Sequence, residues 1–243
     1  MTEPTTAKAA GRPPTPEETA LTLALADKAK AEADLARAEA RDAIAKAQIS
    51  EHMVVINELA LNEKQRLHDI ELSSNEYHRI YTFSGSVTDA SVKLCIIRLT
   101  QWHRLYPGEP MKIVFTSGGG SVIDGMALFD YIQELRRAGH FITTATLGIA
   151  ASMAGILLQA GDVRVMGKEA WLMIHEASFG AQGKTGEVED TVEWIKKVQE
   201  RVLDIFASRS SMTKAQIKSK WLRKDWWISS DEALKLGLID EIA

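Results

Sequence analysis

The chain is poor in cysteine, in long apolar runs and in net charge. Cys95 is the only cysteine among 243 residues, so no internal disulfide can form and the paired-cysteine spacings of zinc and redox sites are excluded. No run of about 18 apolar residues occurs, and the first residues lack the basic-then-apolar order of a signal peptide. We therefore expect a soluble protein of the cytoplasm, with no membrane association.

The charge balance gives no reason to expect a nucleic-acid partner. The formal net charge is -4, and charged residues make up 26% of the chain, which is ordinary for a globular protein. Hydrophobic residues make up 45%, enough for a chain of this length to bury one full core. The length predicts one large domain, alone or with an appendage.

The amino-terminal part differs from the rest in composition. Four of the six prolines lie in the first 16 residues, which predicts a disordered leader over residues 1–16. Alanine supplies 12 of the 28 residues from Ala20 to Ala47, without glycine or proline, so we expect a helical extension over residues 17–72. Its larger apolar residues fall on a seven-residue spacing at Leu21, Leu35, Ile49 and Ile56, but the charged Lys28 and Asp42 occupy the two positions between. This favours a solvated helix over a specific coiled coil. A docking or assembly arm is the functional alternative.

In residues 77–243, apolar strands, glycine turns and amphipathic helices follow one another in turn. This order is typical of crossover units, and it predicts an α/β fold with a parallel sheet. Strands are expected at 80–83, 111–115, 141–147, 163–166 and 171–175, and helices at 89–105, 122–138, 152–160 and 187–208. Two short helices follow, opened by capping-box spacings at Thr213 and Ser229. Between them we expect a polar link at 224–227, and after them a short extended piece at 238–239.

Two residues near the middle of the chain are candidates for nucleophilic chemistry. Ser152 lies between a strand and a helix, where free backbone N–H groups and the helix dipole would face whatever its hydroxyl attacks. Small residues on both sides of it would let a substrate approach closely. The competing interpretation is an ordinary N-cap serine. His175 ends an apolar strand, and its competing interpretation is a core histidine.

A glycine triplet, Gly118–Gly120, follows the carboxyl end of a strand, the edge at which parallel sheets bind ligands. It could offer an N–H group to an oxyanion, but it fits neither the P-loop nor the GxGxxG spacing. The other five histidines lack the paired spacing of metal ligands. We therefore assign no metal and no cofactor.

Five segments of the chain resemble motifs of the Clp protease proteolytic subunit (ClpP) family of serine peptidases, and they follow one another in the family's order. They are Ile80 to Val87, Ser117-Gly118-Gly119-Gly120-Ser121-Val122, Gly148-Ile149-Ala150-Ala151-Ser152-Met153, Met173-Ile174-His175, and Lys224 to Ser229 with the Gly237-Leu238-Ile239-Asp240 that follows. The resemblance runs from about Tyr77 to Ile242. It implies the ClpP/crotonase-like fold of repeated β-β-α units, here with an amino-terminal helical extension.

The resemblance also implies roles for individual residues. Ser152 would be the nucleophile, His175 the general base and Asp225 the residue that orients the imidazole, while the N–H groups of Gly120 and Met153 would form the oxyanion hole. The aspartate rests on the resemblance alone, because the residues themselves do not distinguish it from Asp162, Asp190 or Asp204. The sequence departs from the family at Gly118, where the family has proline.

For assembly, the resemblance implies polypeptide substrates, heptameric rings joined through the helix at 187–208, and an AAA+ unfoldase that feeds a closed chamber. The amino-terminal extension replaces the family's short axial loop, so a capsid-maturation peptidase of ClpP type, with a scaffold as partner, is an alternative. Two further alternatives are a crotonase-like acyl-CoA enzyme and a catalytically silent member of a mixed ring.

Overall fold

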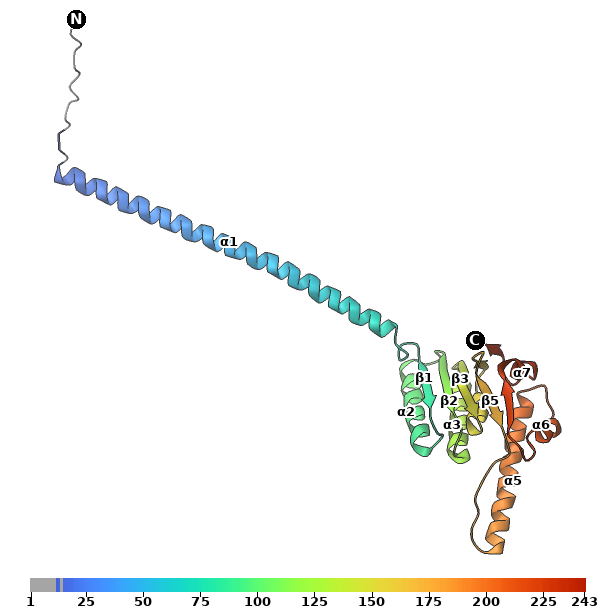
Figure 1. The fold of residues 1–243 in the computed structure, drawn as a ribbon. Coiled ribbons are helices and arrows are strands. Elements are labelled where there is room, and N and C mark those ends of the chain that lie inside the picture. The colour runs from blue at the N-terminus through green and yellow to red at the C-terminus, as the bar shows by residue number, and fades with distance from the viewer. Residues whose placement is uncertain (1–11, 14) are drawn as a thin grey trace. The chain divides into compact units, whose positions relative to one another are not determined.

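The computed structural model describes residues 12, 13 and 15–243, and the chain divides into two compact units, residues 1–69 and 70–243. The expected disordered leader, residues 1–16, lies almost wholly outside the described residues. The first element is α1, a single uninterrupted helix from Pro16 to Leu72 (Figure 1), along the stretch where the composition predicts a helical extension of residues 17–72.

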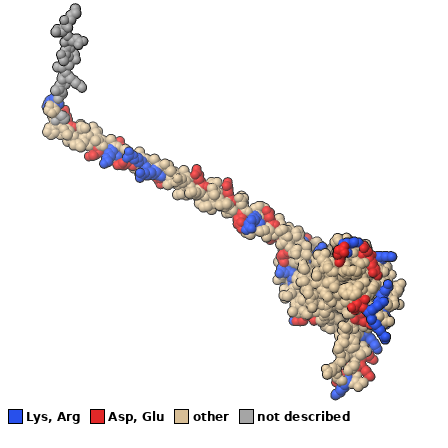
Figure 2. Space-filling model, in the orientation of Figure 1, with Lys and Arg blue, Asp and Glu red and all other residues tan. Residues whose placement is uncertain are grey.

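None of the described residues of helix α1 is buried. Acidic and basic side chains are interspersed along its length (Figure 2). Some pair three or four residues apart, as Lys46 with Asp42 and Arg66 with Glu63 do, at 2.7 Å each. Such pairs stabilise a helix by only about 0.2–0.5 kcal/mol each. No helix of the described residues is both long and apolar enough to cross a membrane.

The second unit is built on one seven-stranded sheet with the order β1-β2-β3-β4-β7, in which β5 pairs with β3, and β6 with β5. All pairs are parallel except β5 with β6. The strands are β1 Ile80–Ser84, β2 Met111–Ser117, β3 Ile142–Ala151, β4 Val163–Met166, β5 Trp171–Ile174, β6 Trp226–Ser229 and β7 Glu241–Ile242. The helices are α2 Asp89–Leu105, α3 Val122–Arg137, α4 Met153–Leu158, α5 Thr185–Ser208, α6 Lys214–Trp221 and α7 Ser230–Lys235.

Strand β3 changes its neighbour halfway along, and this positions the site. Its first half pairs with β4 (Thr143–Thr146), and its second half pairs with β5 (Ile149–Ala151). Between the halves, the register against β2 shifts and Gly148 has a φ of 81°, a value that a glycine adopts without strain. The strand therefore continues to Ala151, four residues beyond the end that the sequence predicts.

The apolar faces of α2, α3 and α4 supply the core against the sheet. Trp102, Phe83, Phe115, Leu99 and Leu128 are all at most 2% exposed. Helix α5 buries side chains only from Ile195 onward, at Ile195, Val202, Leu203 and Phe206, and its amino-terminal part projects past the sheet (Figure 1). Apolar burial of this kind, at roughly 25 cal/mol per Å², is the main source of stability in the second unit.

Two predictions for the carboxyl-terminal part are wrong. Residues 224–227 are not a polar link, because Trp226 begins strand β6, with Trp226 and Ile228 buried against the core. The last extended piece is β7, Glu241–Ile242, rather than residues 238–239, which are buried between α7 and that strand. The short helices α6 and α7 begin after Thr213 and Ser229, as the spacings predict.

A buried arginine ties the carboxyl-terminal segment to the sheet. Arg164, on β4, is 5% exposed and donates to both carboxylate oxygens of Asp240, at 2.6 and 2.9 Å. It also donates to the side chain of Gln159 and to the carbonyl of Arg209. The hydrogen bonds from Arg164 lower the pKa of Asp240, so this carboxylate stays charged in the folded protein.

We predict that Arg164→Met lowers the free energy of unfolding by about 3 kcal/mol, because it removes the partner of the Asp240 carboxylate and leaves the buried Oε1 of Gln159 without its donor. Urea unfolding at pH 7 measures this. The control is Lys168→Met, which removes an exposed pair with Asp231 at 2.7 Å and should cost under about 1 kcal/mol. Equal losses in the two variants would contradict the prediction.

Candidate active site

Ser152 lies at the junction of β3 and α4 in a strained backbone conformation. Its φ is 54° and its ψ is -121°, a region that residues other than glycine rarely adopt. It occupies the N-cap position of α4, yet its hydroxyl accepts no hydrogen bond from the first turn of that helix in the described structure. The N-cap interpretation therefore fails, and the strained backbone points the hydroxyl elsewhere.

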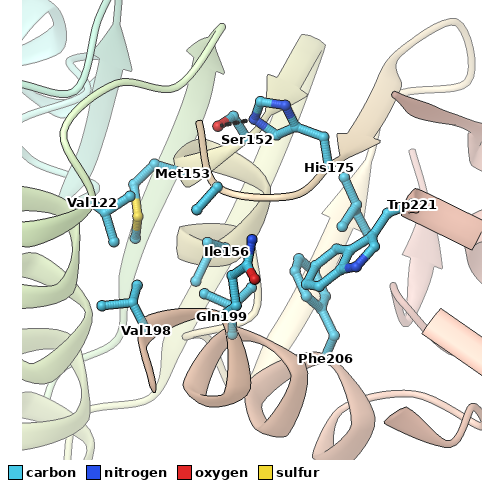
Figure 3. Close-up of a pocket in the computed structure, with 12 residues that line it drawn as sticks. Val122, Ser152, Met153, Ile156, His175, Val198, Gln199, Phe206 and Trp221 are labelled. Carbon is cyan, nitrogen blue, oxygen red and sulfur yellow. Dashed lines mark hydrogen bonds between the residues drawn. The ribbon is translucent and has the colours of Figure 1, made fainter. Parts of the chain in front are cut away.

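The hydroxyl of Ser152 points at His175. The distance from Ser152 Oγ to His175 Nε2 is 2.7 Å, a short hydrogen bond (Figure 3). On the other side of the ring, His175 Nδ1 lies 3.4 Å from Asp225 Oδ1. The side chain of His175 is 24% exposed and that of Asp225 is 54% exposed, so the carboxylate is the member in contact with water. The structure thus brings together all three residues that the sequence and the resemblance single out.

Strand pairing explains why these residues meet. Parallel strands end at the same edge of a sheet, and β3 pairs with β5 through Ala151 and Met173, directly before Ser152 and just before His175. The N–H of Ser152 also donates to the carbonyl of Met173, at 2.9 Å. Because β6 runs antiparallel to β5 with Ile174 opposite Trp226, the preceding Asp225 lies next to His175.

The glycine triplet packs against the serine. Gly119 has a φ of 95°, and a Cβ placed there would lie 2.6 Å from the Cβ of Ser152 and 3.0 Å from the nitrogen of Met153. Val87 pairs with Gly120 and holds the peptide groups on both of its sides by hydrogen bonds. In the described part of the chain, neither the N–H of Gly120 nor that of Met153 donates to a protein acceptor. Both groups are free to bind an oxyanion.

A small cavity of about 30 Å³ opens beside Ser152 and His175 (Figure 3). Its walls come mostly from α4, α5 and α6, with Val122 of α3 and Ile174 of β5, and apart from Ser152 and His175 they are apolar except for Gln199. They include Met153, Ile156, Val198, Val202, Phe206 and Trp221. Sequence reasoning missed these wall residues, because nothing in a helical apolar stripe shows which of its members faces a site rather than the core.

No group of three or more His, Cys, Asp or Glu side chains in the described residues is placed to hold a metal ion. Three other aspartates are candidates from the sequence. Asp162 pairs with Arg136, Asp204 pairs with Lys214, and Asp190 is exposed on α5. Asp225 is thus the carboxylate that the structure places behind the imidazole.

A serine hydroxyl bonded to an imidazole, with a carboxylate on the far side of the ring and free N–H groups beside it, is the constellation of serine hydrolases. The model of the Clp protease family matches residues 62–243, three quarters of the chain. The chain therefore belongs to the Clp protease family, and the α/β fold with its mostly parallel sheet agrees with this. The family makes it a peptidase that assembles into oligomers and acts on polypeptides.

We predict that Gly119→Ala lowers kcat/KM on a short fluorogenic peptide at least about 100-fold, because the new methyl group displaces Ser152 and strains the backbone. The matched control is Gly118→Ala, where an added Cβ meets nothing within 4 Å and φ is not in the left-handed range. That variant should stay within about twofold of the parent. A Gly119→Ala enzyme with more than half the parent's activity would contradict the assigned geometry.

Proposed function

We propose that this protein is a serine endopeptidase in which Ser152, His175 and Asp225 form the catalytic triad. The observation that carries the proposal is the 2.7 Å hydrogen bond between Ser152 Oγ and His175 Nε2, made by a serine whose hydroxyl caps no N–H of the described α4 helix. A serine that served only as a cap would bond to its own helix instead.

The proposed reaction is acyl transfer. Ser152 Oγ attacks the carbonyl carbon of the scissile peptide while His175 Nε2 takes the hydroxyl proton, and the carbonyl oxygen becomes an oxyanion between the N–H groups of Gly120 and Met153. His175 then gives the proton to the departing amine. Water attacks the resulting ester with His175 again as base, which releases the carboxylic acid and restores Ser152. Asp225 keeps Nδ1 of His175 protonated and stabilises the imidazolium.

We predict that a fluorophosphonate probe labels Ser152, and that Ser152→Ala abolishes both labelling and peptide cleavage, because the Ser152 hydroxyl is the nucleophile whose proton His175 is placed to accept. Intact-mass and peptide-mapping measurements locate the adduct. Asp225→Asn should lower kcat on the order of 100-fold, less than the loss of a fully buried triad aspartate, since Asp225 is 54% exposed. Undiminished labelling of Ser152→Ala would rule out Ser152 as the nucleophile.

The apolar cavity beside Ser152 suggests the side chain that a substrate presents before the cleaved bond. We predict that peptides with a small apolar residue at this position are cleaved with kcat/KM at least about tenfold higher than those with Asp or Lys, because an unpaired charge would be buried against Phe206 and Trp221. A series of fluorogenic peptides that differ only at this residue measures the preference. A preference for charged residues would contradict it.

For assembly, we propose homo-oligomeric rings, heptameric as the family resemblance implies, that enclose the site and receive unfolded chains from an AAA+ unfoldase in the cytoplasm. Support comes from apolar side chains left exposed in the second unit, which would be covered by neighbouring copies. They are Leu94 and Ile97 on α2, Ile123 on α3, and Trp194 on the projecting half of α5.

A capsid-maturation peptidase is the second candidate, and α1 is the observation that favours it. Fourteen of the large apolar residues of α1 are exposed, among them the run Met53-Val54-Val55-Ile56. An arm of this kind suits binding to a scaffold protein. Co-purification after co-expression with an unfoldase or with a scaffold separates the two candidates. The family match gives no support to the acyl-CoA alternative.

A further inference from the structure

The segment that carries Asp225 has few contacts of its own. It runs from the end of α6 at the buried Trp221 to the start of β6 at Trp226, and Leu222 within it is 53% exposed. Arg223 has a φ of 57°, a left-handed conformation that costs free energy in any residue with a Cβ. A segment of this kind keeps such a conformation only if contacts with the surrounding structure hold it.

One such contact comes from Glu176, the residue that directly follows His175. Its Oε2 accepts a hydrogen bond from the backbone N–H of Arg223, at 3.0 Å. Within the turn itself, Lys224 N–H donates to the carbonyl of Trp221, at 3.1 Å. Glu176 is therefore the hydrogen-bond link between this segment and the strand end that carries the histidine.

This link matters for Asp225 because that side chain has little else to hold it. Its carboxylate is 54% exposed, and its Oδ1 lies 3.4 Å from His175 Nδ1, beyond the usual length of a charge-assisted hydrogen bond. Asp225 is joined to β6 on one side and to the strained Arg223, two residues away, on the other. If the turn at Arg223 relaxes, the Asp225 carboxylate can move toward water and away from the imidazole.

We propose that Glu176 is a positioning residue, which holds Asp225 beside His175 by fixing the turn at Arg223. The inference rests on the proposed triad. A hydrogen bond from a backbone N–H to a carboxylate is stronger than one between neutral groups, so the bond to Glu176 can hold this strained turn more firmly than the neutral bond from Lys224 N–H to Trp221. Its effect on catalysis is indirect, through the orientation of His175 and the stability of the imidazolium.

The kinetic test compares Glu176→Ala with Glu176→Gln, whose amide oxygen can accept the same hydrogen bond. We expect Glu176→Ala to lower kcat about 5- to 20-fold with KM within about twofold, and Glu176→Gln to stay within about threefold of the parent. The control is Glu169→Ala, an exposed glutamate with no polar partner among the described residues. In an Asp225→Asn background, Glu176→Ala should add less than a further twofold loss.

Hydrogen exchange gives a readout that does not depend on catalysis. The Arg223 amide should exchange at least about tenfold faster in Glu176→Ala than in the parent, while amides of β6 are unchanged. Four results would each overturn the inference. Two concern Glu176→Ala alone: an Arg223 amide that exchanges at the parent's rate, or an undiminished kcat. The other two are a loss in Glu176→Gln as large as in Glu176→Ala, and full additivity of Glu176→Ala with Asp225→Asn. If the parent enzyme has no activity, or if Ser152→Ala is active, the proposed triad is refuted. The exchange measurement would then still report whether Glu176 holds the turn at Arg223.

Discussion

The backbone of Ser152 is the constraint on which the rest of the site depends. A serine at the start of a helix normally turns its hydroxyl back to the first N–H groups, and a φ of 54° prevents this here. The same conformation leaves the N–H of Met153 without a protein acceptor in the described chain and brings the hydroxyl within 2.7 Å of His175. Neighbouring segments hold Ser152 in this strained conformation. Its N–H donates a hydrogen bond to the carbonyl of Met173, and Gly119 packs closely against it.

The path of β3 explains how four separate segments reach this point. Because β3 leaves β4 and joins β5 after Gly148, the ends of β2, β3 and β5 meet at one edge of the sheet. The antiparallel strand β6 then returns Asp225 to the same edge. The triad is thus assembled from strand register, and its least secured member is the aspartate, which stands on a short strained connection outside the sheet. Glu176 is placed where it can compensate for this.

Much of the fold could be predicted from the sequence, because helical periodicity and capping are local signals. The bounds of α2 and α3 follow from apolar spacing and glycine punctuation, and Ser152 and His175 stand out by their places at strand ends. The continuation of β3 to Ala151 could not be predicted, since it depends on which neighbour the strand meets. Strand β6 was missed because Trp226 and Trp227 follow charged residues, and only pairing with β5 makes them a strand. Asp225 needed the family resemblance, and Glu176 needed the three-dimensional contact with Arg223.

The most direct test of the central claim is the structure of the covalent fluorophosphonate adduct. If Ser152 is the nucleophile and the glycine turn forms the oxyanion hole, phosphorus will be bonded to Ser152 Oγ, and the phosphoryl oxygen will lie about 2.7–3.1 Å from the nitrogens of both Gly120 and Met153. An adduct on another residue, or a phosphoryl oxygen that faces solvent away from these two N–H groups, would contradict it.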